Sequence, residues 1–250
     1  MSLEYLLTWM MVFLRSIGII MLFPALTGRA IPVPVRLGLC VCLATLLAGI
    51  VPRATVPAGW WGLVVSASGE ILLGLSLGFI ARMAFAAVEM GGRIISSEIG
   101  LSATPGLGVP DPATEPLAAM LTSLAVVLFF LFGAHQLVLS AFARSFSLSL
   151  AGQPAFDAST VESVIQATSH VLELGLRIAA PFIAMNFLVN LAFSVLGRAV
   201  PKMGVFIVSY SARVIVGLAL LTAAGTLVAR YLFVEFGEVA LQMLQVLPRR

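Results

Sequence analysis

The sequence predicts an all-α integral membrane protein, a bundle of about six long hydrophobic helices. Three observations predict this class. Of the 250 residues, 60% are hydrophobic and only 10% are charged, and the mean hydropathy of +1.10 lies far above that of soluble domains. The chain is long enough for about six crossings of roughly 20 residues each. We therefore expect a single membrane domain over residues 1–250, without a separate soluble domain.

Nearly uncharged stretches recur along the chain and define the candidate helices. They cover residues 6–23, 37–51, 60–80, 117–142, 178–196 and 205–229. The first has no basic segment before it and no small-residue cleavage motif after it, so we expect a retained helix rather than a signal peptide. Prolines in the gaps disfavour continuation of a helix and therefore mark turns.

A loop rich in proline and glycine, residues 101–116, directly follows an amphipathic helical run over residues 81–100. Irregular backbone close to membrane segments cannot face lipid, because its unpaired amide groups would find no water to bond. We therefore expect the loop to be buried in protein or to line a wet cavity. Either environment implies a pore or a partner.

Three charged side chains interrupt the apolar stretches, namely Arg15, Glu70 and Arg213. Intramembrane charges tend to face protein or water and to mark function. Each has an alternative interpretation, in which it pairs with another charge or snorkels to the membrane interface. His135 is compatible with a proton relay, because an imidazole titrates near neutral pH, but a hydrogen-bonded packing histidine is the better interpretation.

Small and polar residues recur at helical spacing in the third stretch. They are Ser66, Glu70, Gly74 and Gly78. Residues four apart share one helix face, and small residues there let a neighbouring backbone approach closely. We expect a packing stripe with Glu70 facing the neighbouring helix.

Two further polar pairs lie on helix faces. Asn186 and Asn190 share a face, and we expect their amides to bond across a helix interface, with exposure to water as the alternative. Glu89 and Arg93 form an i,i+4 pair that supports the run over residues 81–100, although such a pair is worth only about 0.2–0.5 kcal/mol.

Catalysis, metal binding and cofactor binding find no support in the sequence. Cys40 and Cys42 lie two apart in a helical run and point to nearly opposite faces, so we expect neither a mutual disulfide nor a shared metal site. His135 and His170 lack metal-ligand spacing, and the chain has no Walker loop, G-x-S-x-G or H-E-x-x-H motif. The net charge of +3 is dispersed along the loops, unlike the basic and aromatic stripe of a nucleic-acid binder. We expect no catalytic, metal or cofactor site and no nucleic-acid partner.

The positive-inside rule does not orient the bundle, because lysine and arginine are divided equally between the loops of the two sides. Two interpretations stay open. Either other cues set the orientation of ordinary spans, or the helices do not cross as simple spans and sit inside an assembly.

Several segments, taken in order, resemble the FliR family of flagellar export-gate proteins and their counterparts in virulence injectisomes. In the first half they are RAIPVPVRLGL from Arg29, EILLGLSLGF from Glu70, AFAAV from Ala84, GGRII from Gly91, GLS from Gly100 and DP at Asp111. In the second half they are LFF from Leu128, GAH from Gly133, SF at Ser145, Pro181, Asn190, GR at Gly197, Pro201 and VFI from Val205. Their order and spacing carry the resemblance, which spans most of the chain.

The resemblance implies a core subunit of the type III export gate. In that assembly one FliR-like chain combines with FliP-like and FliQ-like chains into a conical helical channel for unfolded proteins, close to FlhB-like and FlhA-like export components. The helices are implied to be bent hairpins rather than ordinary spans, which accounts for the equal division of basic residues. The implied location is the bacterial inner membrane, multi-pass, in the flagellar basal body.

The family also carries a loop that plugs the closed channel, and by position it corresponds to residues 102–116. The candidate plug residues are Ser102, Thr104, Pro105, Gly106, Gly108, Pro110, Asp111 and Pro112. The candidates for polar contacts between subunits are Glu70, Glu89, Arg93, His135, Asn186, Asn190 and Arg213. The implied mechanism is passive gating, with energy supplied by an ATPase or by the proton-motive force through other subunits.

The chain departs from the family after the segment VFI, where many flagellar relatives have Gly-x-Pro and this sequence reads VSYSAR from Val208.

Among the possible functions, a flagellar gate is preferred over an injectisome export apparatus. A second hypothesis is a secondary transporter with Glu70, His135 and Arg213 along a substrate or proton path, but we find no paired repeats of the kind usual in transporters. A membrane enzyme is the third.

Overall fold

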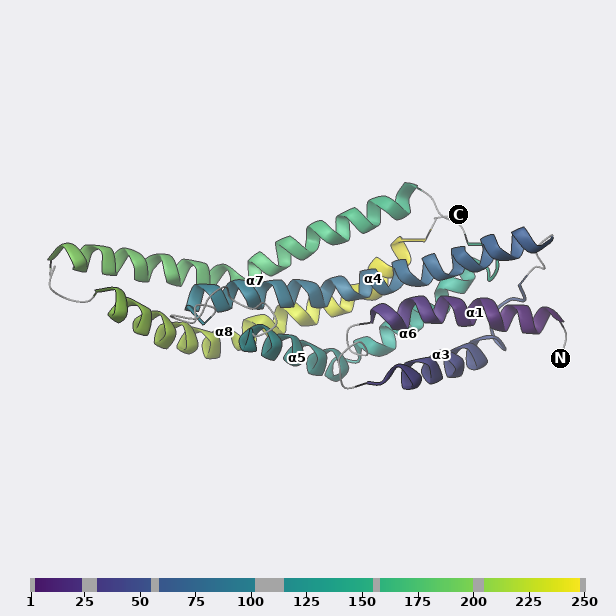
Figure 1. Cartoon of the computed structure of the whole chain (residues 1–250), viewed down its shortest axis with the longest axis horizontal. Helices are drawn as coiled ribbons and strands as arrows, with labels where there is room; N and C mark the ends of the chain where they lie inside the picture. Colours follow the sequence, from purple (N-terminus) through teal and green to yellow (C-terminus); the bar gives the residue numbers. More distant parts are fainter. Residues whose placement is uncertain are drawn as a thin grey trace. The chain divides into compact units, whose positions relative to one another are not determined.

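The computed structural model describes residues 3–23, 31–54, 59–101, 115–154, 158–199 and 205–247. Every regular element in these ranges is an α helix, which confirms the predicted fold class (Figure 1). The helices are α1 (Leu3–Leu22), α3 (Val33–Leu47), α4 (Gly59–Ile99), α5 (Pro116–Leu131), α6 (Ala134–Leu148), α7 (Ala158–Ala199) and α8 (Val205–Gln245).

Four helices, α1, α4, α7 and α8, are long and apolar enough to cross a membrane. The broken pair of α5 and α6 gives a fifth candidate span. Helix α3 has only 15 residues, fewer than the roughly 20 that a crossing needs. The described residues therefore provide four or five spans where the sequence predicts about six, and the membrane bundle itself is as expected.

Helix boundaries differ from the predicted ones at two places. Helix α4 is one continuous helix of 41 residues, because nothing between the predicted segments 60–80 and 81–100 interrupts it. The predicted stretch 117–142 is instead divided at Gly133, which adopts a φ of 70° at the start of α6. Glycine has no Cβ to oppose this left-handed conformation, so the chain breaks its helix there.

By their contacts the helices are grouped into two compact units. The first takes its residues from Met1–Ala84, Phe129–Ser169 and Glu235–Arg250, and the second takes them from Phe85–Leu128 and His170–Val234. Helices α4, α5, α7 and α8 contribute residues to both units.

In the first unit, α1 packs backbone to backbone against the first half of α4. A Cβ added at Gly18 would lie 2.6 Å from the backbone of Gly74, and one added at Gly78 would lie 2.9 Å from the carbonyl oxygen of Ile19. This close approach confirms the predicted packing stripe and identifies α1 as the neighbouring helix. Helix α3 lies alongside α1 (Figure 1).

In the second unit, the C-terminal half of α4 contacts α5, α7 and α8. A Cβ added at Gly91 would lie 3.2 Å from the carbonyl oxygen of Gly175 on α7, and one added at Gly92 would lie 2.9 Å from the Cα of Ala118 on α5. The hydroxyl of Tyr210 on α8 donates a hydrogen bond of 3.1 Å to a backbone carbonyl just beyond α4. Glycines therefore set the helix spacing in this unit as well.

Candidate functional site

A fully buried ion pair joins α1 and α4 in the first unit. Nε of Arg15 donates to Oε2 of Glu70 at 2.6 Å, and Nη2 of Arg15 donates to Oε1 of Glu70 at 3.1 Å. Neither side chain has any exposed surface. The two parallel bonds make this a bidentate pair, the strongest geometry for an arginine and a carboxylate. The glycines that bring α1 and α4 together place the two charged groups within reach of each other.

The same pair fixes the segment that follows α6. Arg15 donates from Nη1 to Oγ of Ser145 at 3.1 Å and from Nη2 to the carbonyl oxygen of Ser149 at 3.1 Å. Glu70 Oε1 accepts a bond of 2.8 Å from the backbone N–H of Gly152. One ion pair thus holds three parts of the chain, and we call this group of Arg15, Glu70, Ser145, Ser149 and Gly152 the clamp.

The clamp is suited to positioning rather than to chemistry. All three guanidinium nitrogens of Arg15 donate and both carboxylate oxygens of Glu70 accept, and the guanidinium lies 4.1 Å from the ring centroid of Phe146. A pair without exposed surface offers no atom to a substrate. Glu70 therefore contacts its own chain, as in the alternative interpretation of an intramembrane charge, and has no surface with which to contact another subunit.

The second unit contains a row of polar side chains between α4 and α7. Nδ2 of Asn186 donates to Oε2 of Glu98 at 2.5 Å, and Nδ2 of Asn190 donates to Oδ1 of Asn186 at 3.1 Å. Glu98 and Asn186 are half-buried, whereas Asn190 is exposed. The expected amide contact across a helix interface is present at Asn186. We call Glu98, Asn186 and Asn190 the polar row.

Three other predicted residues lie apart from these groups. Glu89 and Arg93 form their i,i+4 ion pair at 2.7 Å with both side chains about half exposed, beside a shallow hollow on the same helix. Arg213 on α8 is half-buried, and its Nε is buried without a hydrogen-bond partner among the described residues. All three keep a role between subunits as a prediction.

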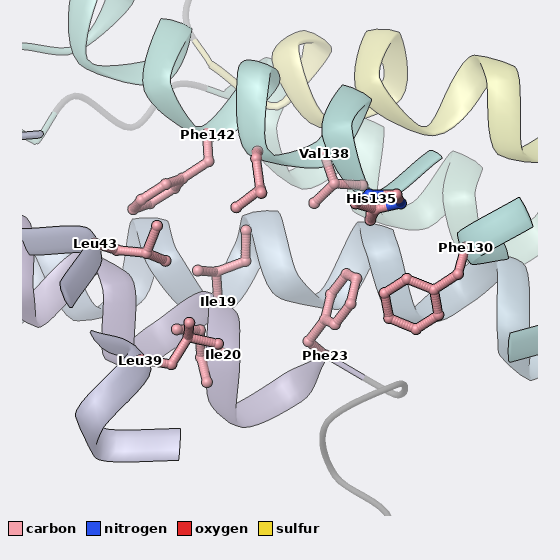
Figure 2. Close-up of a pocket in the computed structure, with 10 residues that line it drawn as sticks. Ile19, Ile20, Phe23, Leu39, Leu43, Phe130, His135, Val138 and Phe142 are labelled. Carbon is pink, nitrogen blue, oxygen red and sulfur yellow. The ribbon is translucent and has the colours of Figure 1, made fainter. Parts of the chain in front are cut away.

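His135 lines an apolar cavity of about 190 Å³ in the first unit (Figure 2). The lining residues are Ile19, Ile20, Phe23, Leu39, Leu43, Phe130, His135, Val138, Leu139 and Phe142. The imidazole packs 5.3 Å from the ring of Phe130, and its Nδ1 is buried without a hydrogen-bond partner among the described residues. The imidazole therefore packs in the apolar cavity as expected, and its Nδ1 does not supply the expected hydrogen bond.

The candidate plug loop falls on residues 102–114, which lie outside the described residues. This holds for Ser102, Thr104, Pro105, Gly106, Gly108, Pro110, Asp111 and Pro112. The last predicted loop residue, Pro116, is the first residue of α5, a position that suits proline because its missing N–H would have no helical partner there.

Sequence reasoning missed the partners in the clamp and one end of the polar row. Ser149 and Gly152 act through backbone atoms, which every residue type offers, so the sequence carries no signal for them. Arg15 and Glu70 did carry one, because each is the single charge in its apolar stretch. Glu98 had no comparable signal at the end of an amphipathic run. Among the described residues, no group of three His, Cys, Asp or Glu side chains could hold a metal ion.

Comparison with known proteins gives matches over nearly the whole chain. Flagellar biosynthetic protein FliR of Escherichia coli (strain K12) is 30% identical over 257 residues, which covers 98% of this chain and 97% of that protein. FliR of Bacillus subtilis (strain 168) is 27% identical and covers 85% and 84%. Yop proteins translocation protein T of Yersinia pestis is 27% identical and covers 82% and 80%.

The family match has the same extent. Residues 6–239 match the family described as bacterial export proteins, family 1. This range contains the clamp, the polar row, the helices α3 to α7 and most of α1 and α8, so the resemblance seen in short segments extends over most of the chain. The chain belongs to the bacterial export proteins, family 1.

Proposed function

We propose that this chain is a core structural subunit of the type III protein export gate in the bacterial inner membrane, within the flagellar basal body. The family match over residues 6–239 carries the proposal. The multi-pass helical fold agrees with it, since four or five of the described helices suit a membrane. The chain would act by completing a channel through which unfolded proteins leave the cell.

The exposed apolar surface supports assembly with other membrane subunits. In the most apolar windows of α7 and α8, only 22% and 17% of the residues are buried by the chain itself. Such faces need lipid or another helix against them. We assign them to FliP-like and FliQ-like subunits, with FlhB-like and FlhA-like export components as further partners and the remaining surface in contact with lipid.

We assign the hydrogen bonds and ion pairs between subunits to the polar residues that have accessible surface. Arg93 and Asn190 are exposed, whereas Glu89 and Arg213 are half-buried. A charged or amide group at a helix surface in the membrane is stabilised only by a polar neighbour. Asn186 would support Asn190 within the second unit. In the first unit, His135 would supply a polar group of its own and the clamp would keep the helices rigid.

The gate would work passively. The loop at residues 102–116 would obstruct the lumen until export begins, because irregular backbone rich in proline and glycine suits a narrow protein-lined space. Energy would come from an ATPase or from the proton-motive force through other subunits.

Deletion of residues 104–110 tests the plug directly. We expect the assembled gate that carries this deletion to leak small ions, because the obstruction is shortened while the flanking helices remain. The measurement is ion flux into vesicles that contain the purified complex. The control for loop length is a chain in which a Gly-Ser segment of the same length replaces residues 104–110. An unchanged leak from a normally assembled complex would contradict the plug.

The first test of the whole proposal is co-purification. A tagged chain extracted from its native membrane in mild detergent should bring FliP-like and FliQ-like proteins, identified by mass spectrometry. Flagellar types of these proteins, together with loss of motility on deletion of the gene, support the flagellar gate. Partners of the injectisome type would move the chain to the alternative that its similarity to Yop proteins translocation protein T keeps open. Recovery of the chain from its native membrane without either set of partners would contradict both.

A further inference from the structure

The C-terminal end of α4 is closed by a Schellman motif. The N–H of Leu101 donates to the carbonyl oxygen of Ser96 at 2.9 Å, and the N–H of Gly100 donates to that of Ser97 at 3.1 Å. This pair of bonds ends a helix at a residue in the left-handed conformation, usually glycine, and Gly100 has a φ of 91°. The chain therefore turns away from the helix at Gly100.

Tyr210 on α8 covers this turn. Its hydroxyl donates to the carbonyl oxygen of Gly100 at 3.1 Å. Its ring lies where a side chain at position 100 would otherwise stand, because a Cβ added at Gly100 would be 3.0 Å from Cε2 of Tyr210 and 3.5 Å from Cδ2. The tyrosine thus holds the turn by a hydrogen bond and by direct contact, and we call Gly100 and Tyr210 the turn contact.

The residues just before the turn are also fixed by neighbouring helices. Glu98 accepts the hydrogen bond of 2.5 Å from Asn186 on α7. Ile99 is fully buried, and a Cβ added at Gly217 on α8 would lie 2.6 Å from its Cγ1. Leu101, directly after the turn, is 37% exposed. The second unit thus fixes α4 up to its last residue, and the direction taken at Leu101 depends on the turn contact.

Glycine makes the turn possible but does not hold it. Without a Cβ, glycine adopts a wide range of φ and ψ, and a rotation at one residue changes the direction of the chain that follows. We propose that Tyr210 is a positioning residue, which removes this freedom and fixes the direction in which the chain leaves α4. Its importance for the gate rests on the proposed function, because the candidate plug loop begins at residue 102.

Spin labels measure this direction without reference to export. One label replaces Leu101 and the other replaces Leu172, an exposed residue of α7 in the same unit. The full-length chain also carries Cys40→Ala and Cys42→Ala, so that it has no other cysteine. Electron–electron resonance should show a distance distribution about twice as wide with Tyr210→Ala, because glycine alone leaves the turn free. An unchanged width would overturn the proposal.

Two controls separate positioning from a general loss of packing. A reference pair of labels at Leu172 and Leu218, on α7 and α8, should keep its width in Tyr210→Ala. Broadening of the reference pair would overturn the proposal, because it would mean that the unit as a whole has loosened. Tyr231→Ala removes a tyrosine further along α8 and should leave both distributions unchanged.

Tyr210→Phe separates the hydrogen bond from the ring contact. It keeps the ring and deletes only the hydroxyl, so the distribution at Leu101 should broaden by less than with Tyr210→Ala. This variant carries the test if the alanine variant does not fold. In that case an unchanged width with Tyr210→Phe overturns the proposal.

Ion leak then connects the direction of the chain to the gate. An assembled gate with Tyr210→Ala should leak small ions, as expected for deletion of residues 104–110, whereas a gate with Tyr231→Ala should stay closed. A broadened distribution in a gate that does not leak would contradict the plug and leave the role of Tyr210 intact. An unchanged distribution would overturn the role of Tyr210 whatever the leak, and it would leave the proposed function intact.

Discussion

The two units use their polar side chains in opposite ways. In the first unit the clamp is closed, since the side chains of Arg15 and Glu70 are fully buried and each guanidinium nitrogen and each carboxylate oxygen has a hydrogen-bond partner within the chain. In the second unit the polar row is open, because it begins at half-buried Glu98 and ends at exposed Asn190. Both depend on α4, which supplies one acidic residue to each.

The difference shows which part of the chain is self-sufficient. A closed cluster stabilises its own unit and gains nothing from a neighbour, whereas an open one leaves hydrogen-bonding groups that only another molecule satisfies. We therefore expect substitutions in the clamp to affect the stability of the isolated chain, and substitutions at the open end of the row to affect mainly assembly.

The largest effect should follow from Glu70→Ala. This change leaves Arg15 buried without its counter-charge, and breaking a buried pair in this way costs about 3–5 kcal/mol. The measurement is the thermal unfolding midpoint of the detergent-solubilised chain. Glu89→Ala is the control, because it removes a half-exposed i,i+4 pair worth only about 0.2–0.5 kcal/mol. Equal shifts for the two variants would contradict the assignment of the clamp.

A double substitution sharpens the same test. Arg15→Met with Glu70→Leu removes both charges at once, and apolar replacements of a buried pair are often neutral or stabilising. The double variant should therefore unfold at a higher temperature than Glu70→Ala alone. If it is no more stable than the single variant, the loss comes from packing around Glu70 and not from an unpaired charge.

An intermediate effect is expected where the helix backbones meet. Gly74→Ala would place a methyl group against the backbone carbonyl of Arg15, and overpacking of this kind costs about 1–3 kcal/mol. Gly175→Ala in the second unit should cost less, since its Cβ would meet the flexible side chain of Met90 at 3.3 Å as well as a carbonyl at 3.2 Å. Gly225→Ala has nothing within 4 Å and is the control. A larger loss at Gly175 than at Gly74 in thermal unfolding would reverse the comparison.

The smallest effect on the isolated chain should come from Asn186→Leu. The substitution removes the hydrogen bond to Glu98, and interhelical bonds of this type in membrane proteins are worth about 0.6 kcal/mol on average and at most about 1.7. The row is partly exposed, so water or detergent head groups replace some of what is lost. A shift in the unfolding midpoint as large as that of Glu70→Ala would show that the row is closed in the same sense as the clamp.

Composition and helical spacing were sufficient to predict the class of fold and the packing stripe at Gly74 and Gly78, because both depend on local patterns of residue type. They were not sufficient for the break at Gly133, where several helical continuations were compatible with the apolar sequence and packing decides between them. They also missed that α4 is a single helix, since an amphipathic pattern after an apolar one looks like a separate element.

The candidate site was predictable only in part for a related reason. Arg15 and Glu70 stood out as lone charges, yet they lie 55 positions apart, and only the approach of α1 to α4 makes them partners. Ser149 and Gly152 enter the clamp through the backbone, so no residue type identifies them. Asn186 was expected at a helix interface from its spacing alone, while its partner Glu98 comes from another helix.

The buried position of Arg15 has a consequence for biogenesis. Helix α1 is made before α4, and an arginine near the middle of a membrane helix opposes insertion by about 2.5–3.5 kcal/mol. Its counter-charge on α4 does not exist until the ribosome has passed residue 70. Until then the charge on α1 has no partner, and Glu70 supplies the counter-charge that offsets this cost. The clamp therefore ties the energetics of α1 in the membrane to a residue that is translated later.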